Sequence, residues 1–337
     1  MKPLIHCLFL LTLLVIHHPV RADDFPSWVA TFRPEALQRG VSAQTFDTAF
    51  QNVVPNDRVI ELDQKQPERA KAGFAVYLSK VINQARIDNG RAALVQNRPL
   101  LNTVSSRYGV PPEMIVSLWG LETSYGKNTG GFDLIQALAT LAWEGRRSEF
   151  FKTELVTALL ILQNGHITRE DFKGSWAGAM GQNQFMPSSW SKYAVDFNGD
   201  GHKDIWKTQS DIFASTANYL NQNGWNPNLK WGWQVIPTAN LHQFAPDQVM
   251  PYEQWLRSGI KFQGRPPAIP AATPLKLVVP DGGEGRYYIV TKNFDVIKSW
   301  NRSNYFALTV GLLSDYVAQG SSNAVMRDNS ADGNYNQ

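Results

Sequence analysis

Apolar residues spaced by three and four positions dominate the first two thirds of the sequence, and this spacing constrains the fold more than any other feature. Residues 69–86 show it clearly, because one face of a helix over this range would carry Phe74, Tyr77, Leu78, Val81 and Ile82. Comparable stretches over about 111–162 and 211–222 predict further helices. The larger part of the chain is therefore expected to be helical.

Short strands are predicted only in the last third of the chain. Runs rich in β-branched and aromatic residues, separated by Pro and Gly, occupy residues 231–236, 275–279, 287–290 and 294–300. A closing helix is predicted over residues 305–317. The expected fold class is mainly α (α+β), with a small β element near the C-terminus.

The first residues have the features of a secretory signal. Lys2 gives a positive start, residues 4–16 form an apolar run, and Val20 and Ala22 supply the small residues of a cleavage site. The run has 13 residues, whereas a bilayer span needs about 20. We expect residues 1–22 to be a signal peptide removed after Ala22, with the chain exported and without a stable membrane anchor. A retained anchor is the alternative.

Cleavage at this position would leave a nearly neutral chain without cysteine. Cys7 is the only cysteine and lies early in the apolar run instead of after it, which argues against lipidation. A mature chain without cysteine has no disulfide. Removing Lys2 and Arg21 from the 32 basic residues leaves 30 against 29 acidic ones, a balance that does not favour nucleic acid as a partner.

Aromatic side chains are abundant, with 11 Trp and 11 Tyr. Large flat side chains stack on sugar faces and also fill protein cores. Trp225, Trp231 and Trp233 lie within nine residues of one another. Sugar stacking and a packed aromatic cluster are both open interpretations of these three residues.

One carboxylate continues an apolar helical stripe. In the helix predicted after Pro111 and Pro112, the side chains of Ile115, Leu118 and Trp119 share a face, and Glu122 is the next position on it. Burial disfavours the charged form of a carboxylate and raises its pKa, which suits a general acid at neutral pH. The turn over residues 123–126 would leave Glu122 at the rim of a cleft. A buried Glu paired with an Arg for structural reasons is the alternative.

These residues also carry a family resemblance. Trp119–Gly126 resembles the catalytic segment of the lytic murein transglycosylase B family, glycoside hydrolase family 103. Further motifs of that family follow in the same order along the chain, at Gly174–Ser189, Asp196–His202 and Ala217–Tyr219. Leu62–Glu68 and Asn301–Tyr305 also fit. The resemblance covers most of the chain from about Phe25 to Val317.

The resemblance implies a reaction and a fold. The family cleaves the bond between N-acetylmuramic acid and N-acetylglucosamine in peptidoglycan without water, by closing a 1,6-anhydro ring on the muramoyl residue. The substrate's own 6-hydroxyl is the nucleophile, so one residue suffices, and Glu122 is expected to act first as acid and then as base. No catalytic cofactor is implied. The expected fold has a lysozyme-like helical catalytic core.

The same resemblance implies five substrate-binding residues. Ser175, Gln184 and Tyr219 match positions that line the sugar subsites, and Asn301 and Tyr305 would close the cleft from the C-terminal segment. Structural alternatives are a turn-forming Ser175, a core amide at Gln184 and a core ring at Tyr219.

A calcium-binding loop is predicted after residue 195. Asp196, Asn198, Asp200, His202 and Asp204 occupy positions 1, 3, 5, 7 and 9 of an EF-hand-like pattern, with Gly201 at position 6. His202 would give its backbone carbonyl, and Asp204 would act through water. An EF-hand ends with Glu at position 12, whereas this chain has Lys207 there. The resemblance favours Asp211 as the closing ligand of a structural Ca²⁺ site, and a metal-free turn is the alternative.

With the resemblance, we expect five segments. They are a signal peptide at 1–22, an N-terminal helical region at 23–100, a lysozyme-like catalytic core with the EF-hand-like loop at 101–225, a small β element and closing helix at 226–319, and a disordered tail at 320–337.

The sequence thus predicts a periplasmic lytic transglycosylase that acts on peptidoglycan glycan strands. A hydrolytic muramidase is one alternative and requires a second carboxylate across the cleft. A non-catalytic, calcium-stabilised peptidoglycan-binding protein is another, but it leaves a carboxylate on an apolar stripe unexplained.

Overall fold

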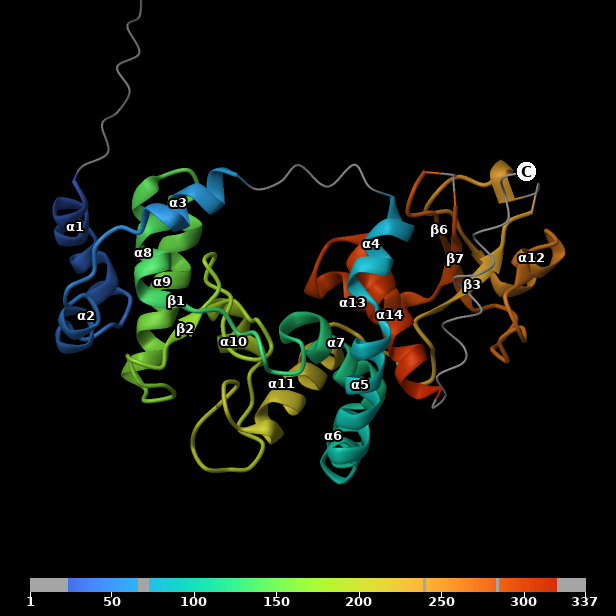
Figure 1. The fold of residues 1–337 in the computed structure, drawn as a ribbon, viewed down its shortest axis with the longest axis horizontal. Coiled ribbons are helices and arrows are strands. Elements are labelled where there is room, and N and C mark those ends of the chain that lie inside the picture. Colours follow the sequence, from blue (N-terminus) through green and yellow to red (C-terminus); the bar gives the residue numbers. More distant parts are fainter. Residues whose placement is uncertain (1–23, 66–72, 239–240, 283–284, 320–337) are drawn as a thin grey trace, which may run out of the picture.

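Helices lie in a row along the long axis of the molecule, and a small sheet closes one end (Figure 1). The structure is a computed structural model that describes residues 24–65, 73–238, 241–282 and 285–319. The expected signal peptide and C-terminal tail lie outside these residues. In the described part of the chain, no helix is long and apolar enough to cross a membrane.

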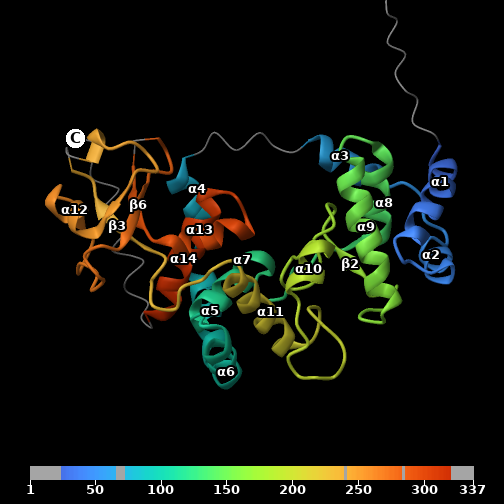
Figure 2. The same ribbon diagram turned by 180° about the vertical axis from the view of Figure 1, so that it is seen from behind.

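The end of the molecule opposite the sheet is built from the first helices of the chain and one long helical hairpin (Figure 2). Side-chain oxygens of Asp24, Ser42 and Asn56 cap the first three helices by accepting backbone N–H groups. These are α1 (Phe25–Gln38), α2 (Ala43–Ala49) and α3 (Asp57–Gln64). They pack beside the hairpin of α8 (Leu134–Glu144) and α9 (Ser148–Gln163).

The middle of the molecule surrounds one helix, α7 (Pro112–Thr123). Its residues 114–120 are all buried, so α7 has no solvent-facing side over this stretch. The helices that pack on it are α5 (Gln84–Gln96), α6 (Arg98–Tyr108), α11 (Gln209–Gln222) and α14 (Asn304–Ala318). The remaining helices of this region are α4 (Phe74–Val81), α10 (Pro187–Tyr193) and α13 (Lys292–Trp300).

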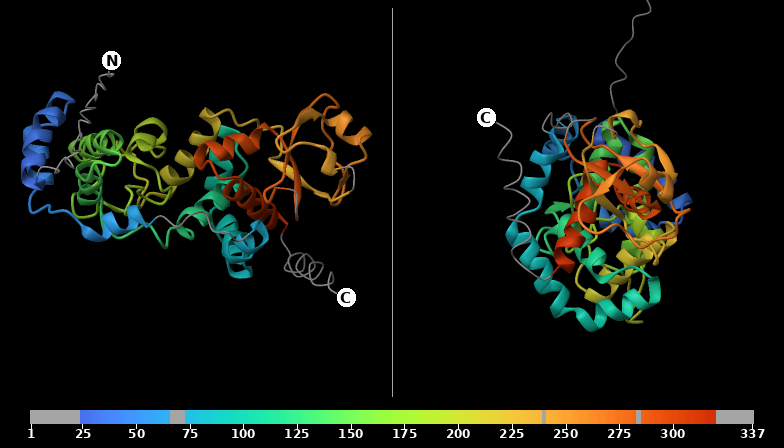
Figure 3. Two further views of the ribbon diagram at one scale, coloured as in Figure 1. Left: turned by 90° about the horizontal axis from the view of Figure 1, so that it is seen from above. Right: turned by 90° about the vertical axis from the view of Figure 1, so that its right-hand side faces the viewer.

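The sheet at the far end is antiparallel, with strand order β4-β6-β7-β3-β5. Its strands are β3 (Gly232–Ile236), β4 (Val249–Pro251), β5 (Lys261–Phe262), β6 (Pro274–Val278) and β7 (Tyr287–Val290). With α12 (Tyr252–Arg257) and the 3-10 helix η1 (Leu241–Gln243), it encloses a hydrophobic core of its own. Strands β1 (Phe132–Asp133) and β2 (Lys173–Gly174) form a separate pair. Figure 3 shows from above how the sheet continues the row of helices.

The structure confirms the predicted fold class, mainly α with a small β element near the C-terminus. One predicted strand is wrong, because residues 294–300 belong to helix α13. The Thr291 hydroxyl caps this helix by accepting the N–H of Asn293, and Phe294 and Ile297 turn to one buried face at helical spacing.

The aromatic residues near the sheet form packing contacts. Trp225 and Trp231 are buried, and Trp233 packs edge-on against Phe262. The interpretation as a packed cluster therefore holds for Trp225 and Trp231. The division of the chain into five segments stays a prediction.

The indole of Trp231, directly before β3, packs against a glycine of α14 and so connects the sheet to the helices. Trp231 lies against Gly311 in α14, and a Cβ atom built on Gly311 would stand 2.3 Å from the ring. Glycine in a helix interior costs about 1 kcal/mol relative to alanine. The close approach of the indole ring explains why this position carries glycine all the same.

We expect Gly311→Ala to destabilise the protein by about 2 kcal/mol, because the added methyl group overpacks the contact with Trp231. Urea unfolding measures the effect. In a Trp231→Ala background the same change should cost little, since the indole is gone and alanine favours the helix. Additive losses in the double variant would show that the added methyl group does not meet the indole.

Candidate active site

Glu122 lies in the last turn of α7, where the chain leaves the buried helix. Ser124 and Tyr125 follow with left-handed backbone angles (φ 51° and 62°), which are uncommon for residues other than glycine. The Thr123 hydroxyl stabilises this turn by accepting the N–H of Gly126 and donating to the carbonyl of Gln182. The turn therefore ends the helix at the predicted place and brings Glu122 to the edge of the packed interior.

The Glu122 carboxyl lies in a poorly solvated environment. Ile115 and Leu118 on the same helix face are fully buried, and Trp119 is 8% exposed. Burial raises the pKa of Glu122 to about 7, and a hydrogen bond from Trp300 opposes the shift. Among the described residues, no Lys, Arg or His side chain forms an ion pair with Glu122. This argues against the alternative of a Glu–Arg pair held for structural reasons.

Trp300 is the direct partner of this carboxyl. Its indole Nε1–H donates to Oε1 of Glu122 at 2.9 Å, across 178 positions of sequence. The sequence analysis did not include Trp300 among the site residues. Trp300 directly precedes Asn301, the first residue of the last matching motif, and this position is the signal that could have indicated it.

Tyr219 holds Trp300 in place. The two rings lie 4.6 Å apart between centroids, and the Tyr219 hydroxyl donates to the backbone carbonyl of Ser299 at 2.6 Å. Phe185 packs against both rings. Tyr219 is 8% exposed, so in this structure its ring contributes mainly to packing behind Trp300.

Ser175 and Gln184 lie against the same short segment after α7. The Gln184 amide donates to the carbonyls of Thr129 and Gly181, and its backbone has a left-handed φ of 51°. A Cβ atom on Gly130 would stand 2.6 Å from the backbone nitrogen of Ser175. The Ser175 hydroxyl accepts the N–H of Ala179 at 3.0 Å and closes a turn. Both side chains are half-buried.

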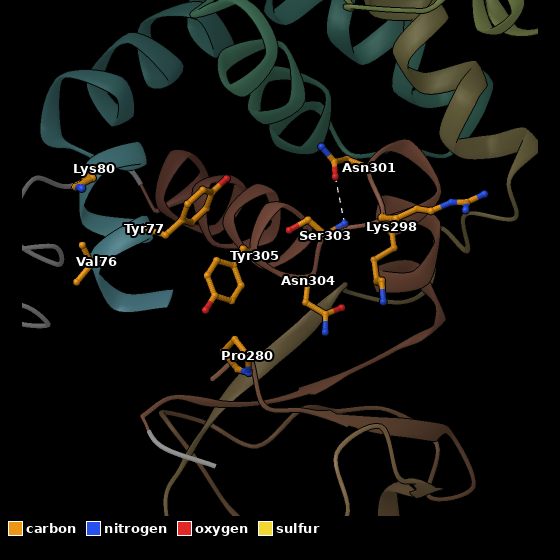
Figure 4. A pocket seen from close by; sticks show the side chains of 10 residues that line it. Val76, Tyr77, Lys80, Pro280, Lys298, Asn301, Ser303, Asn304 and Tyr305 are labelled. Atoms are coloured by element: carbon orange, nitrogen blue, oxygen red, sulfur yellow. Dashed lines mark hydrogen bonds between the residues drawn. The ribbon is translucent and has the colours of Figure 1, made fainter. Parts of the chain in front are cut away.

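Asn301 and Tyr305 line a pocket of about 740 Å³ beside α4 (Figure 4). The Tyr305 hydroxyl donates to Asp281, and its ring packs on Tyr77. The pKa of Tyr77 is raised, first by burial and second by the negative charge of Glu122. The negative charge of Glu122 therefore acts on one wall of the pocket.

Gln182 is a further residue that the sequence analysis missed. Its side-chain oxygen accepts the indole N–H of Trp119 at 2.8 Å, and its amide donates to the carbonyl of Trp206 at 2.8 Å. It therefore ties α7 to the loop that precedes α11.

The predicted calcium loop is wound around its own carboxylates. Asp196 accepts the backbone N–H groups of Gly199, Asp200 and Gly201. Asp200 accepts the N–H of His202 and the amide of Asn198.

Asp211 lies at the base of the loop and accepts the N–H groups of Phe197 and Asp204. Oxygen donors of this kind suit Ca²⁺. Over the ranges that the structure describes, however, no group of three or more Asp, Glu, His or Cys side chains could hold a metal ion.

A carboxyl whose pKa burial raises to about 7, at the end of a buried helix in a mainly helical fold, fits an enzyme of the lysozyme-like class. Comparisons with known proteins agree. The family described as the transglycosylase SLT domain matches residues 24–315. Membrane-bound lytic murein transglycosylase B of Escherichia coli strain K12 is 37% identical over 259 residues, which are 75% of this chain and 70% of that protein.

Two solved structures extend the likeness. SltB3 of Pseudomonas aeruginosa, in complex with NAG-anhNAM-pentapeptide, superimposes with a TM-score of 0.84 and 40% identity over 88% of this chain and 80% of that chain. The lytic transglycosylase Slt35 of Escherichia coli, in complex with calcium, gives a TM-score of 0.74 and 32% identity over 86% and 92% of the two chains.

The chain belongs to the transglycosylase SLT family and is a lytic transglycosylase of peptidoglycan. The resemblance to the lytic murein transglycosylase B family is confirmed.

We expect Trp300→Phe to raise the pKa of Glu122 further, because the indole N–H stabilises the charged carboxylate more than the protonated carboxyl. If protonated Glu122 is the active form, the alkaline limb of the kcat/KM profile moves upward by roughly one pH unit. Turnover of glycan strands across pH 5–10 measures it.

Trp255→Phe is the matched control, since Trp255 donates its indole N–H to the carbonyl of Leu275 within the core of the sheet. It should lower stability without moving the pH profile. An alkaline limb that stays in place in Trp300→Phe would contradict the role of this hydrogen bond.

Proposed function

We propose that the enzyme cleaves the β-1,4 bond between N-acetylmuramic acid and N-acetylglucosamine without water and leaves a 1,6-anhydro-N-acetylmuramic acid end. Glu122 is the single acid and base of this reaction. The observation that carries the proposal is its pKa of about 7, since both protonation states are then accessible near neutral pH. The SltB3 structure contains the anhydro form of a muropeptide, which supports the same product.

The two half-steps need opposite states of one carboxyl. Protonated Glu122 gives its proton to the leaving glycosidic oxygen, and the resulting carboxylate takes the proton of the muramoyl 6-hydroxyl as that oxygen closes on the anomeric carbon. Because Trp300 occupies Oε1, we assign both proton transfers to Oε2. An intramolecular hydroxyl supplies the high effective concentration that replaces an activated water.

A hydrolytic mechanism is less well supported. It needs a second carboxylate as base or nucleophile. Asp133 is the next carboxylate after Glu122 in sequence, and it forms an ion pair with Arg169 and caps α8. Within the described ranges, burial and the Trp300 hydrogen bond shift the pKa of Glu122, and no other carboxylate there contributes.

We propose that Ser175, Gln184, Asn301 and Tyr305 contact the glycan. Asn301 and Tyr305 line the pocket in Figure 4, and Ser175 and Gln184 lie against the segment after α7. Tyr219 is also proposed for the sugar subsites, and its contact with Trp300 gives it a second role in orienting the indole that binds Glu122.

We infer that the enzyme works in the periplasm, where peptidoglycan lies. The relatives act on the cell wall by name, and the N-terminal sequence has the pattern of a cleaved secretory signal.

We further propose that the loop binds a structural Ca²⁺ through Asp196, Asn198, Asp200, the carbonyl of His202 and Asp211, once these side chains turn from the arrangement in this structure, in which they are not grouped around an ion site. The spacing of these residues and the calcium complex of Slt35 support this site. Binding must compete with the backbone amides that these carboxylates already accept, so it is expected to be weak.

We expect Glu122→Gln to reduce turnover about 10³-fold or more, because the substitution keeps the shape of the side chain but removes the transferable proton. Mass spectrometry of products released from purified sacculi measures both the rate and the anhydro ends. Glu113→Gln, in the first turn of the same helix, is the matched control and should stay active. Full activity of Glu122→Gln would overturn the assignment, as would hydrolysed reducing ends from the unaltered enzyme.

We expect millimolar Ca²⁺ to raise the melting temperature in a concentration-dependent way, because an ion bound only by the folded state stabilises it. Calorimetry with and without chelator measures the shift, and Asp200→Ala should abolish it. No shift, or an equal shift in Asp200→Ala, would rule out the site.

A further inference from the structure

Two neighbours of Glu122 in α7 are held by one residue of a distant loop. Trp119, one helical turn before Glu122, donates its indole N–H to the side-chain oxygen of Gln182 at 2.8 Å. Thr123, directly after Glu122, donates its hydroxyl to the backbone carbonyl of Gln182 at 3.1 Å. Gln182 therefore binds the last turn of α7 on both sides of the catalytic carboxyl, although it lies 63 positions after Trp119.

The indole of Trp119 is confined as well as hydrogen-bonded. Tyr125 and Phe213 both pack edge-on against it, with ring centroids at 5.5 Å and 5.2 Å. The ring is buried, and a buried indole N–H needs a hydrogen-bond acceptor. The side-chain oxygen of Gln182 supplies that acceptor and so fixes the direction in which the indole points.

Gln182 is itself firmly anchored. Its backbone N–H donates to the carbonyl of Ile205 at 2.8 Å, and its side-chain amide donates to the carbonyl of Trp206 at 2.8 Å. The turn after Glu122 also closes on it, since a Cβ atom on Gly126 would stand 2.3 Å from its side-chain oxygen. Both the backbone and the side chain of Gln182 thus donate and accept a hydrogen bond, and neither can move without breaking one.

We propose that Gln182 is a positioning residue for the reaction, which fixes the Trp119 indole and the turn after Glu122 and so keeps the carboxyl in place for both proton transfers. It acts through Trp119 and Thr123, not on the reacting atoms. Because Trp119 shares a helix face with Glu122, a fixed indole also limits the access of water to that carboxyl. The inference rests on the proposed function of Glu122.

Gln182→Leu in the full chain tests this proposal, because leucine fills a similar space without the amide. We expect kcat on glycan strands to fall about tenfold with KM nearly unchanged, since a misplaced acid slows the chemical step and not the binding. The alkaline limb of the kcat/KM profile should move to lower pH, because added water brings the pKa of Glu122 back towards its ordinary value. Trp300→Phe is expected to move the same limb the opposite way.

Gln163→Leu is the matched control. Gln163, at the end of α9, also bridges two segments, because its side-chain oxygen accepts the N–H of Ser42 at 2.6 Å and its amide donates to the carbonyl of Gly40 at 3.1 Å. This variant should lower the melting temperature and leave kcat and the pH profile unchanged. The comparison separates the loss of a bridging amide from the loss of positioning.

A double-mutant cycle shows whether Gln182 acts through the indole. Trp119→Phe keeps an aromatic ring but removes the N–H that Gln182 accepts, and it should also lower kcat about tenfold with KM nearly unchanged. Adding Gln182→Leu to Trp119→Phe should then cost little more, because the shared hydrogen bond is already gone. Independent effects would multiply to a loss of about a hundredfold.

Unchanged kcat in Gln182→Leu, or losses that multiply in the double variant, would overturn the proposal. If Gln182→Leu does not fold, Trp119→Phe decides alone, and unchanged kcat there overturns the proposal too. A failure of the proposed reaction is distinct from these results, since it requires that Glu122→Gln stays active or that the unaltered enzyme releases hydrolysed reducing ends.

Discussion

The burial of α7 on all sides is the constraint on which the active site depends. A helix with no solvent-facing side carries its last turn into a region of low polarity, and Glu122 is in that turn. Desolvation alone favours the protonated carboxyl, which the proposed proton transfer to the leaving oxygen needs, and disfavours the carboxylate that the second proposed transfer needs. The hydrogen bond from the indole N–H of Trp300 lowers the pKa of Glu122. In the part of the chain that the structure describes, the balance of these two effects sets the pKa of Glu122 without a charged partner.

This balance couples the middle of the chain to its last helices. Trp300 ends α13, and its ring is fixed by Tyr219 of α11 and Phe185. The helix that follows, α14, packs on α4, α5 and α7. The environment of Glu122 is therefore completed only when the last helices have docked on the middle of the chain, and a fragment that ended before α13 would keep the carboxyl without its partner.

The sequence alone predicted the parts of the site that follow local rules. The stripe of Ile115, Leu118 and Trp119 placed Glu122 at the end of a buried helix, and the turn after it was expected. A short apolar run such as residues 294–300 does not distinguish the strand period from the helix period, and the cap by Thr291 is the feature that decides for a helix. The contact between Trp300 and Glu122 spans 178 positions, so no local pattern contains it.

The sheet begins and ends at neighbouring points of the helical body, since Gly232 of β3 pairs with Val290 of β7. A segment whose entry and exit adjoin can change in length or sequence between relatives without displacing the helices on either side. That freedom extends to β4, β5 and α12, which lie away from the site. Trp231 and Asp281 lack this freedom, because Trp231 packs on α14 and Asp281 is hydrogen-bonded to α4 and α14. The outer strands can thus be altered independently of the helices, whereas a change at Trp231 or Asp281 alters the contacts that hold the sheet to α14 and α4.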